Sequence, residues 1–93
     1  MMMVIRMIKA WTDDAWNDYL YWYEQGNRAT VKKINRLIKD IDRHPFEGIG
    51  KPEPLKHELQ GKWSRRITQE DRLIYEIDSQ EETVVIYSAK DHY

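Results

Sequence analysis

The main change in the spacing of apolar residues along this 93-residue chain falls at the segment 45–54, PFEGIGKPEP. Before it, residues 12–43 carry apolar side chains at helical spacing. After it, three runs at 61–67, 72–77 and 83–89 are rich in β-branched and aromatic residues, as is an earlier run at 4–11. The chain therefore predicts one strand, then helices, then three strands, with a Pro/Gly-rich loop of the length that commonly carries function.

Local signals mark the ends of two predicted helices. Thr12 can cap the first helix and Gly26 can end it, while Asn27 opens the second and Pro45 stops it. Each helix has one apolar face: Trp16, Tyr19, Leu20 and Tyr23 in the first, and Val31, Ile34, Leu37, Ile38 and Ile41 in the second. The opposite face of the second helix carries a basic stripe, Lys32, Arg36, Lys39 and Arg43. Such a stripe is either a solvated face or a contact for a large anionic partner.

The order of these elements predicts an α+β fold, βααβββ, in which the two helices pack on one face of an antiparallel sheet. The short turns after the second and third strand runs favour antiparallel neighbours. Ninety-three residues predict a single domain. With no cysteine, the chain has neither a disulfide framework nor a cysteine zinc site. Arg6 and Lys9 interrupt the only candidate signal segment, and we expect a cytoplasmic protein.

Charge is distributed unevenly, although the net charge is only −1. Residues 51–67 hold five cations, Lys51, Lys56, Lys62, Arg65 and Arg66, against two acids, Glu53 and Glu58. A local basic patch of this kind can bind phosphates weakly. Charges that protect a strand edge would leave the same pattern.

Three groups in the second half could perform chemistry. Glu53 lies between two prolines, so a carboxylate there is held on a stiff backbone and suits a general base, or is only a polar loop residue. Strand alternation puts Arg66 and Arg72 on the face opposite Leu73, where two guanidiniums would suit a phosphate or form surface ion pairs. His92 titrates near neutrality and can act as an acid or a base, although penultimate residues are often frayed.

Together these groups meet the requirements of RNA self-cleavage, namely a base for the 2′-hydroxyl, cations for the phosphorane and an acid for the leaving 5′-oxygen. The histidines at 44, 57 and 92 show no metal-ligand spacing. We therefore expect no metal and no cofactor.

Three segments carry a resemblance to a known family: AWTDDAWNDYLYWYEQGNRATVKKINRLIKDI, PFEGIGKPEPLKHELQGKWSRRITQEDRLIYEI and the ending DHY. With them the chain closely resembles the YoeB-type toxins of the RelE superfamily of toxin–antitoxin modules. The resemblance starts at Met7, which suggests that residues 1–6 are an extension or that translation starts later. It implies a microbial-ribonuclease-like fold and an mRNA interferase acting in the ribosomal A site.

On the family pattern, the general base falls on Glu53, the phosphate-stabilising arginine on Arg72 and the general acid on His92. Supporting positions fall on Lys56, Arg66 and Tyr93. Apart from the family pattern, Lys51 is a further candidate for binding phosphate or RNA, and the charge of the basic stripe predicts that it contacts ribosomal RNA. The implied partners are a YefM-type antitoxin, a second toxin copy, and operator DNA bound jointly with the antitoxin. The alternative is a non-catalytic toxin of the same fold that poisons DNA gyrase by contact.

Overall fold

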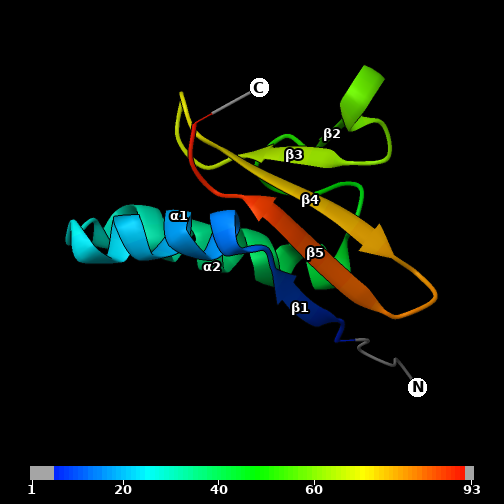
Figure 1. Ribbon diagram of the computed structural model, residues 1–93, viewed down its shortest axis with the longest axis horizontal. Coiled ribbons are helices and arrows are strands. Elements are labelled where there is room, and N and C mark those ends of the chain that lie inside the picture. The colour runs from blue at the N-terminus through cyan, green and yellow to red at the C-terminus, as the bar shows by residue number, and fades with distance from the viewer. Residues whose placement is uncertain (1–5, 92–93) are drawn as a thin grey trace.

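The computed structural model describes residues 6–91, which form a helix pair beside a five-stranded sheet (Figure 1). In chain order the elements are β1 (Ile8–Trp11), α1 (Asp13–Glu24), α2 (Arg28–Arg43), β2 (Glu53–Pro54), the short 3₁₀ helix η1 (His57–Leu59), β3 (Trp63–Arg66), β4 (Arg72–Asp78) and β5 (Thr83–Ser88). The α+β class and the order βααβββ are confirmed, with the two-residue strand β2 added inside the predicted loop. No helix in this part of the chain is long and apolar enough to cross a membrane.

The two helices begin where their capping residues predict. The Thr12 hydroxyl accepts a hydrogen bond from the Ala15 N–H at 3.1 Å, and the Asn27 side chain accepts one from the Thr30 N–H at 3.1 Å. Each bond satisfies an N–H group that has no partner within the helix. Gly26 follows α1 with φ +70°, a conformation that glycine adopts without steric cost.

The buried face of α1 differs by one residue from the predicted one. Ala15 is fully buried, whereas Trp16 is 46% exposed and Tyr23 is 67% exposed. The inward positions are Ala15, Asp18, Tyr19 and Trp22, which repeat the predicted spacing one residue earlier. Two polar contacts fix this rotation, because the Asp18 carboxylate accepts from the Ala89 N–H and the Trp22 indole donates to the Ala89 carbonyl.

The sheet has the strand order β1-β5-β4-β3-β2 and is mixed rather than wholly antiparallel. Three pairs of neighbouring strands are antiparallel, namely β5–β4, β4–β3 and β3–β2, but β1 pairs with β5 in parallel. Parallel neighbours need a long connection, and here the helices and three strands lie between them in sequence. β2 forms an edge, where the missing N–H of Pro54 costs no sheet hydrogen bond.

The core lies between α2 and one face of the sheet. Its fully buried side chains come from both layers: Ile34, Leu37, Ile41, Leu73, Tyr75, Val84 and Ile86. The predicted inner face of α2 is confirmed at Ile34, Leu37, Ile38 and Ile41, while Thr30 is buried and Val31 is half-buried. The helices thus cover one face of the sheet; we call the opposite face the outer face.

Candidate active site on the outer face of the sheet

The outer face brings together the residues that strand alternation grouped in the sequence. Arg66 of β3 lies directly opposite Arg72 of β4. One row along, Ser64 lies opposite Ile74 of β4 on one side and Glu53 of β2 on the other. Directly paired residues on one face have Cβ atoms about 5 Å apart. The sheet therefore holds an arginine pair and, one row away, the carboxylate of Glu53.

The arginine pair has no carboxylate partner among residues 6–91, where the ion pairs are Lys9–Asp42, His44–Glu47 and Arg65–Asp40. Arg72 is instead oriented by the turn that precedes β4: its Nη1 donates to the carbonyls of Thr68, Gln69 and Asp71, each at 3.1 Å. Carbonyls orient a guanidinium without neutralising its charge. Two like charges placed directly opposite repel, so an anion bound between them would be stabilised.

The end of the described chain is attached to the same corner. The Arg72 N–H donates to the Asp91 carbonyl at 2.8 Å, and the Asp91 N–H donates to the Asp71 carboxylate at 2.8 Å. His92 and Tyr93, the predicted acid and a supporting residue, lie outside the described residues. Their roles therefore stay predictions.

Glu53 is exposed on β2, which pairs with β3, and further main-chain hydrogen bonds hold its segment on both sides of that pairing. The Leu55 N–H donates to the Lys62 carbonyl at 2.9 Å, and the Arg66 N–H donates to the Gly50 carbonyl at 2.7 Å. Lys51 and Lys56, the other predicted supporting residues, lie on either side of β2 and are both exposed. Glu53 therefore stands on a short, anchored edge strand rather than on a free loop.

Arg65 is a correction to the predicted basic patch, because its side chain is fully buried on the helix side of the sheet. Its guanidinium donates to the Asp40 carboxylate at 2.6 Å and to the Tyr75 hydroxyl at 3.0 Å. It also donates to the carbonyls of His44, Glu47 and Ile49. Every donor of the guanidinium is thus used to fasten the start of the loop 45–54 to the core.

The ionisation of Asp40 and Tyr75 reflects this buried contact. Burial raises the pKa of Asp40, but the hydrogen bonds from Arg65 and the Ile49 N–H outweigh it, so the pKa is lowered overall. Burial likewise raises the pKa of Tyr75, and here it outweighs the opposing effect of Arg65. Tyr75 stays protonated and donates to the Pro45 carbonyl at 2.7 Å.

Four outer-face residues were not singled out in the sequence: Ser64, Glu76, Tyr87 and Ser88. The register of β4 with β5 shifts between Ile74 and Tyr75, so β5 carries one extra residue there, Tyr87. Ser64 and Ser88 are almost fully buried, and within residues 6–91 the Ser88 hydroxyl has no hydrogen-bond partner. The alternating pattern of 83–89 gives no signal of this irregularity.

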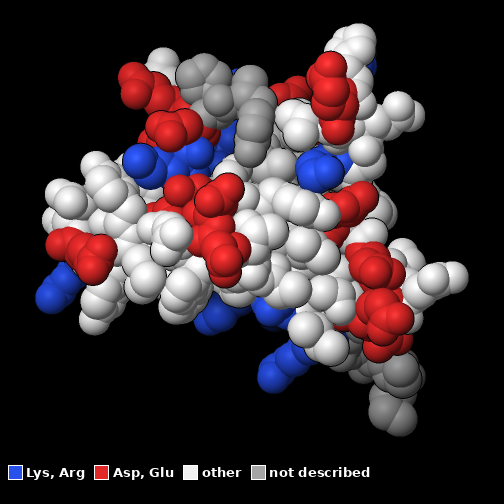
Figure 2. All heavy atoms as spheres, in the orientation of Figure 1, with Lys and Arg blue, Asp and Glu red and all other residues white. Residues whose placement is uncertain are grey.

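The surface cations occupy separate places. In the view of Figure 2, Lys and Arg atoms gather near the start of β4 and again farther along the sheet, with carboxylates around both groups. The basic stripe lies elsewhere, on α2, and all four of its side chains are exposed. Arg36, Lys39 and Arg43 line a groove of about 810 Å³ together with Lys9 and Arg6.

Comparison with known proteins gives the context for this arrangement. Residues 11–93 match the family model described as the YoeB-like toxin of bacterial type II toxin–antitoxin systems. The chain belongs to the YoeB family of toxins. The toxin YoeB of Escherichia coli (strain K12) is 55% identical over 83 residues, which make up 89% of this chain and 95% of that protein. The predicted resemblance is therefore confirmed, and the chain is a toxin of a type II toxin–antitoxin system.

Solved structures of YoeB toxins have the same fold. A YoeB/ParE toxin from Agrobacterium tumefaciens is similar with a TM-score of 0.88 and 41% identity, over 94% of this chain and all of that one. A YoeB dimer from Staphylococcus aureus is similar with a TM-score of 0.85 and 46% identity, over 95% of this chain and 99% of that one. A heterotetrameric YoeB–YefM toxin–antitoxin complex from the same organism is similar with a TM-score of 0.83 and 46% identity, over the same shares of the two chains.

Proposed function

We propose that this YoeB-family toxin is a metal-independent, ribosome-dependent endoribonuclease that cleaves mRNA in the A site and so inhibits translation. The observation that supports this most directly is the pairing of Arg66 with Arg72, without a carboxylate partner among residues 6–91, one row from Glu53 on the outer face. Such a face offers a phosphate site and a base side by side.

In the proposed reaction, Glu53 takes the proton of the 2′-hydroxyl, and the 2′-oxygen attacks the adjacent phosphorus. Arg72, assisted by Arg66, stabilises the charge of the phosphorane that forms. The bond from phosphorus to the 5′-oxygen then breaks, and His92 gives a proton to that oxygen. One product ends in a 2′,3′-cyclic phosphate, which hydrolysis can open to a 3′-phosphate. Each proton transfer uses a side chain, so no step requires a metal.

The remaining predicted residues would hold RNA in place. Lys51 and Lys56, exposed beside Glu53, suit phosphates on either side of the cleaved bond. Tyr93 would assist His92 at the end of the chain. With few such contacts and a net charge of −1, the toxin should bind free RNA weakly, so the ribosome would supply substrate positioning.

The basic groove on α2 supports docking on ribosomal RNA. Two carboxylates line it, but Asp42 is paired with Lys9 and Asp40 with Arg65, so Arg36, Lys39 and Arg43 leave the groove positive. Reversing two of these charges, Arg36→Glu and Lys39→Glu, should weaken ribosome binding and flatten its dependence on salt. Unchanged binding at fixed salt would refute this contact. Lys32 lies on the same stripe but does not line the groove.

The enzymatic proposal is tested by cleavage of a defined mRNA on programmed ribosomes. The wild type should cut within the A-site codon, whereas Glu53→Ala and His92→Gln should bind ribosomes but cut at least about a hundredfold more slowly, the usual loss on removing an acid or a base. Arg72→Lys, which loses a planar donor for the phosphorane, should cut about as slowly. Glu24→Ala removes an exposed carboxylate at the end of α1 and serves as the matched control. Full activity of Glu53→Ala would refute the assigned base.

The alternative is a contact poison of DNA gyrase with the same fold. A contact poison has no need of a general base, so Glu53→Ala and His92→Gln would remain toxic in cells. An intact message on ribosomes together with inhibition of gyrase supercoiling would favour this alternative. The Arg66–Arg72 row, which has no carboxylate partner within the described part of the chain, lies one row from Glu53 and favours the nuclease.

We further propose that a YefM-like antitoxin neutralises this toxin, that the toxin forms homodimers, and that toxin and antitoxin together repress their operon. The YoeB–YefM complex and the YoeB dimer of Staphylococcus aureus support the first two assemblies. Light scattering after size exclusion should give a toxin dimer and a larger complex with antitoxin. Operator DNA should shift in a gel only when antitoxin is present, and no shift at any ratio would refute joint repression.

A further inference from the structure

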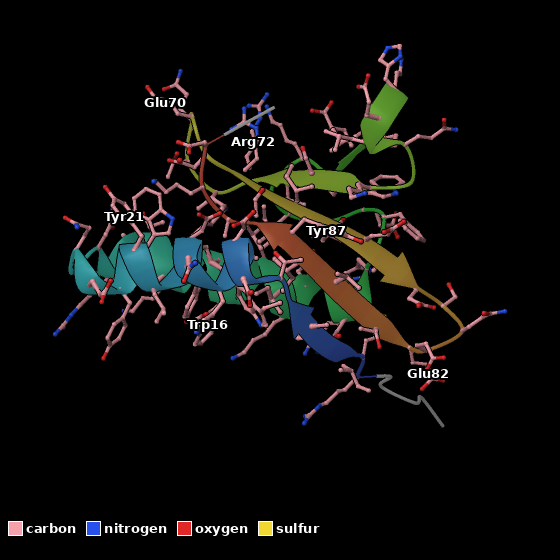
Figure 3. The ribbon with its side chains drawn as sticks, viewed as in Figure 1. Trp16, Tyr21, Glu70, Arg72, Glu82 and Tyr87 are labelled. Atoms are coloured by element: carbon pink, nitrogen blue, oxygen red, sulfur yellow. The ribbon has the colours of Figure 1, made fainter. Side chains whose placement is uncertain are left out.

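A second polar group lies on the outer face, farther along β4 and β5 from the arginine pair. The Tyr87 hydroxyl donates to Oε1 of Glu76 at 2.8 Å, and Nζ of Lys62 stands 4.5 Å from the centre of the Tyr87 ring. Figure 3 shows the labelled Tyr87 lying along the sheet at a distance from Arg72. None of these three residues has a role in the proposed cleavage step.

The β-bulge explains why Tyr87 reaches Glu76. Because Tyr75 pairs with Ile86 and Ile74 pairs with Ser88, Tyr87 is the extra residue between two registered pairs. A bulge of this kind redirects a side chain. Its hydroxyl is thereby brought to the carboxylate of the neighbouring strand. This hydrogen bond raises the pKa of Tyr87, with burial adding to the effect, so the phenol stays protonated and keeps the carboxylate in position.

The second oxygen of Glu76 lies beside Gly61, which has no side chain to cover it. A Cβ placed on Gly61 would lie 3.2 Å from Oε2 of Glu76, and the φ of Gly61 is +95°. Glu76, Tyr87 and Val85 also line an open cavity of about 420 Å³, together with residues 77–80 at the end of β4 and the turn that follows it. This volume lies within the range of small-ligand sites, about 300–1,000 Å³.

We propose that this cavity binds a guanine base of the RNA, with Glu76 as the residue that selects it. The identity of the ligand as RNA rests on the proposed nuclease function. A carboxylate only accepts hydrogen bonds, and guanine presents two adjacent donors, N1–H and the N2 amino group, on its Watson–Crick edge. Cytosine and adenine offer one amino group there, and uracil offers a single N–H between two acceptors. Lys62, whose Nζ stands over the ring of Tyr87, would neutralise the phosphate attached to this nucleotide.

The spacing on the sheet agrees with a guanine base of the RNA bound near the cleaved bond. Glu76 is two residues from Ile74 along β4, which corresponds to about 7 Å. Ile74 belongs to the row that carries Glu53, and Arg72 lies one row beyond it. The cavity therefore stands on the same face as the proposed phosphate site, within reach of the base on an adjoining nucleotide. Tyr87 acts as a positioning residue, since it touches Glu76 rather than the base.

The first test measures binding of single nucleotides by NMR, independently of cleavage. Guanosine 3′-monophosphate should shift the backbone amides of Glu76, Val85 and Tyr87 and bind about tenfold more tightly than the cytidine nucleotide, as expected for one bidentate base contact. Glu76→Gln should bring the four nucleotides to within about threefold of one another. Tyr87→Phe keeps the ring but releases the carboxylate, so it should reduce the preference for guanine partly.

Glu81→Gln, which removes an exposed carboxylate from the same hairpin, is the matched control and should keep the preference. Equal binding of all four nucleotides would overturn the proposal, as would guanosine shifts that map away from these amides. A preference for guanine that survives Glu76→Gln would overturn it as well.

The second test is cleavage of an mRNA with randomised A-site codons. A guanine should be enriched at one fixed position relative to the cut in the wild type and lost in Glu76→Gln. Cleavage with the same base distribution in both proteins would overturn the guanine site and leave the nuclease standing. Guanosine binding at Glu76 without any cleavage would support the base site and refute the nuclease.

Discussion

In an Arg65→Lys variant, the buried side chain keeps its charge but loses the planar fork of donors. The guanidinium now reaches one carboxylate, one hydroxyl and three main-chain carbonyls, which lie in different directions around it. A lysine ammonium has three donors at a single point. If it stays with Asp40, which Nη1 contacts, it leaves the carbonyls of His44 and Glu47 without their donor, because both of those bonds come from Nη2.

The size of the effect follows from these lost contacts. A buried acceptor left without a partner costs about 1–3 kcal/mol. Two such carbonyls, with a weakened contact to Asp40, give a destabilisation of about 3–5 kcal/mol, similar to the cost of breaking a buried ion pair. A chain of this length has a total stability on the order of 5–14 kcal/mol. This single conservative change should therefore remove a large fraction of the free energy of unfolding.

Urea unfolding followed by tryptophan fluorescence measures this loss, since the four tryptophans lie in α1 and in the sheet. Arg28→Lys is the control, because Arg28 is exposed at the start of α2 and should change stability by less than about 0.5 kcal/mol. A loss below about 1 kcal/mol for Arg65→Lys, with an unchanged urea dependence, would refute the argument that this guanidinium anchors the loop.

Three further perturbations have defined outcomes. The lowered pKa of Asp40 means that its ion pair stabilises the fold above about pH 4 and is lost as the pH falls through the folded-state pKa. Thermal unfolding of Asp40→Asn between pH 2 and 6 should therefore show a shallower pH dependence than the wild type, and an equal slope would contradict this. Gly50→Ala would place a Cβ 2.7 Å from Leu37 at φ +80° and should cost about 2–3 kcal/mol in urea, whereas Gly26→Ala, with open space around it, should cost about 1 kcal/mol; equal costs would show that the close contact is unimportant. Asn27→Ala should cost about 1 kcal/mol through the lost cap, and a helix content and stability equal to the wild type would rule this cap out as a stabilising contact.

The local features of the fold could be predicted because short-range interactions determine them. Thr12 and Asn27 begin the helices through bonds to residues three positions later. The rotation of α1 could not be predicted in the same way, because the neighbouring residues Trp22 and Tyr23 are both aromatic and belong to the two alternative faces. Contacts of Asp18 and Trp22 with Ala89, about seventy residues away in sequence, decide it. The parallel pairing of β1 with β5 is similarly a long-range outcome.

In the candidate site, too, the features that depend on local pattern could be predicted and those that depend on strand pairing could not. Strand alternation and a short turn were enough to predict that Arg66 and Arg72 share a face. The β-bulge at Tyr87 changes the alternation by one residue, so the contact between Tyr87 and Glu76 has no counterpart in the sequence pattern. The strand β2 was also not predicted, because two residues, one of them a proline, are too few to show the alternation of side chains that marks a strand.

Adjacent arginines on β3 have opposite tasks because a strand points successive side chains to opposite faces. Arg65 turns inward and fastens residues 44–49, while Arg66 turns outward beside Arg72. The loop that Arg65 fastens continues directly into β2, which carries Glu53. Since Arg65 is the neighbour of Arg66 on β3, its contacts with the loop fix where Glu53 lies relative to the arginine pair. A loosened Arg65 contact should displace Glu53 before the sheet itself unfolds, since β2 is held to β3 by few main-chain bonds. Under conditions in which Arg65→Lys remains folded, its rate of cleavage should fall while ribosome binding through α2 is retained.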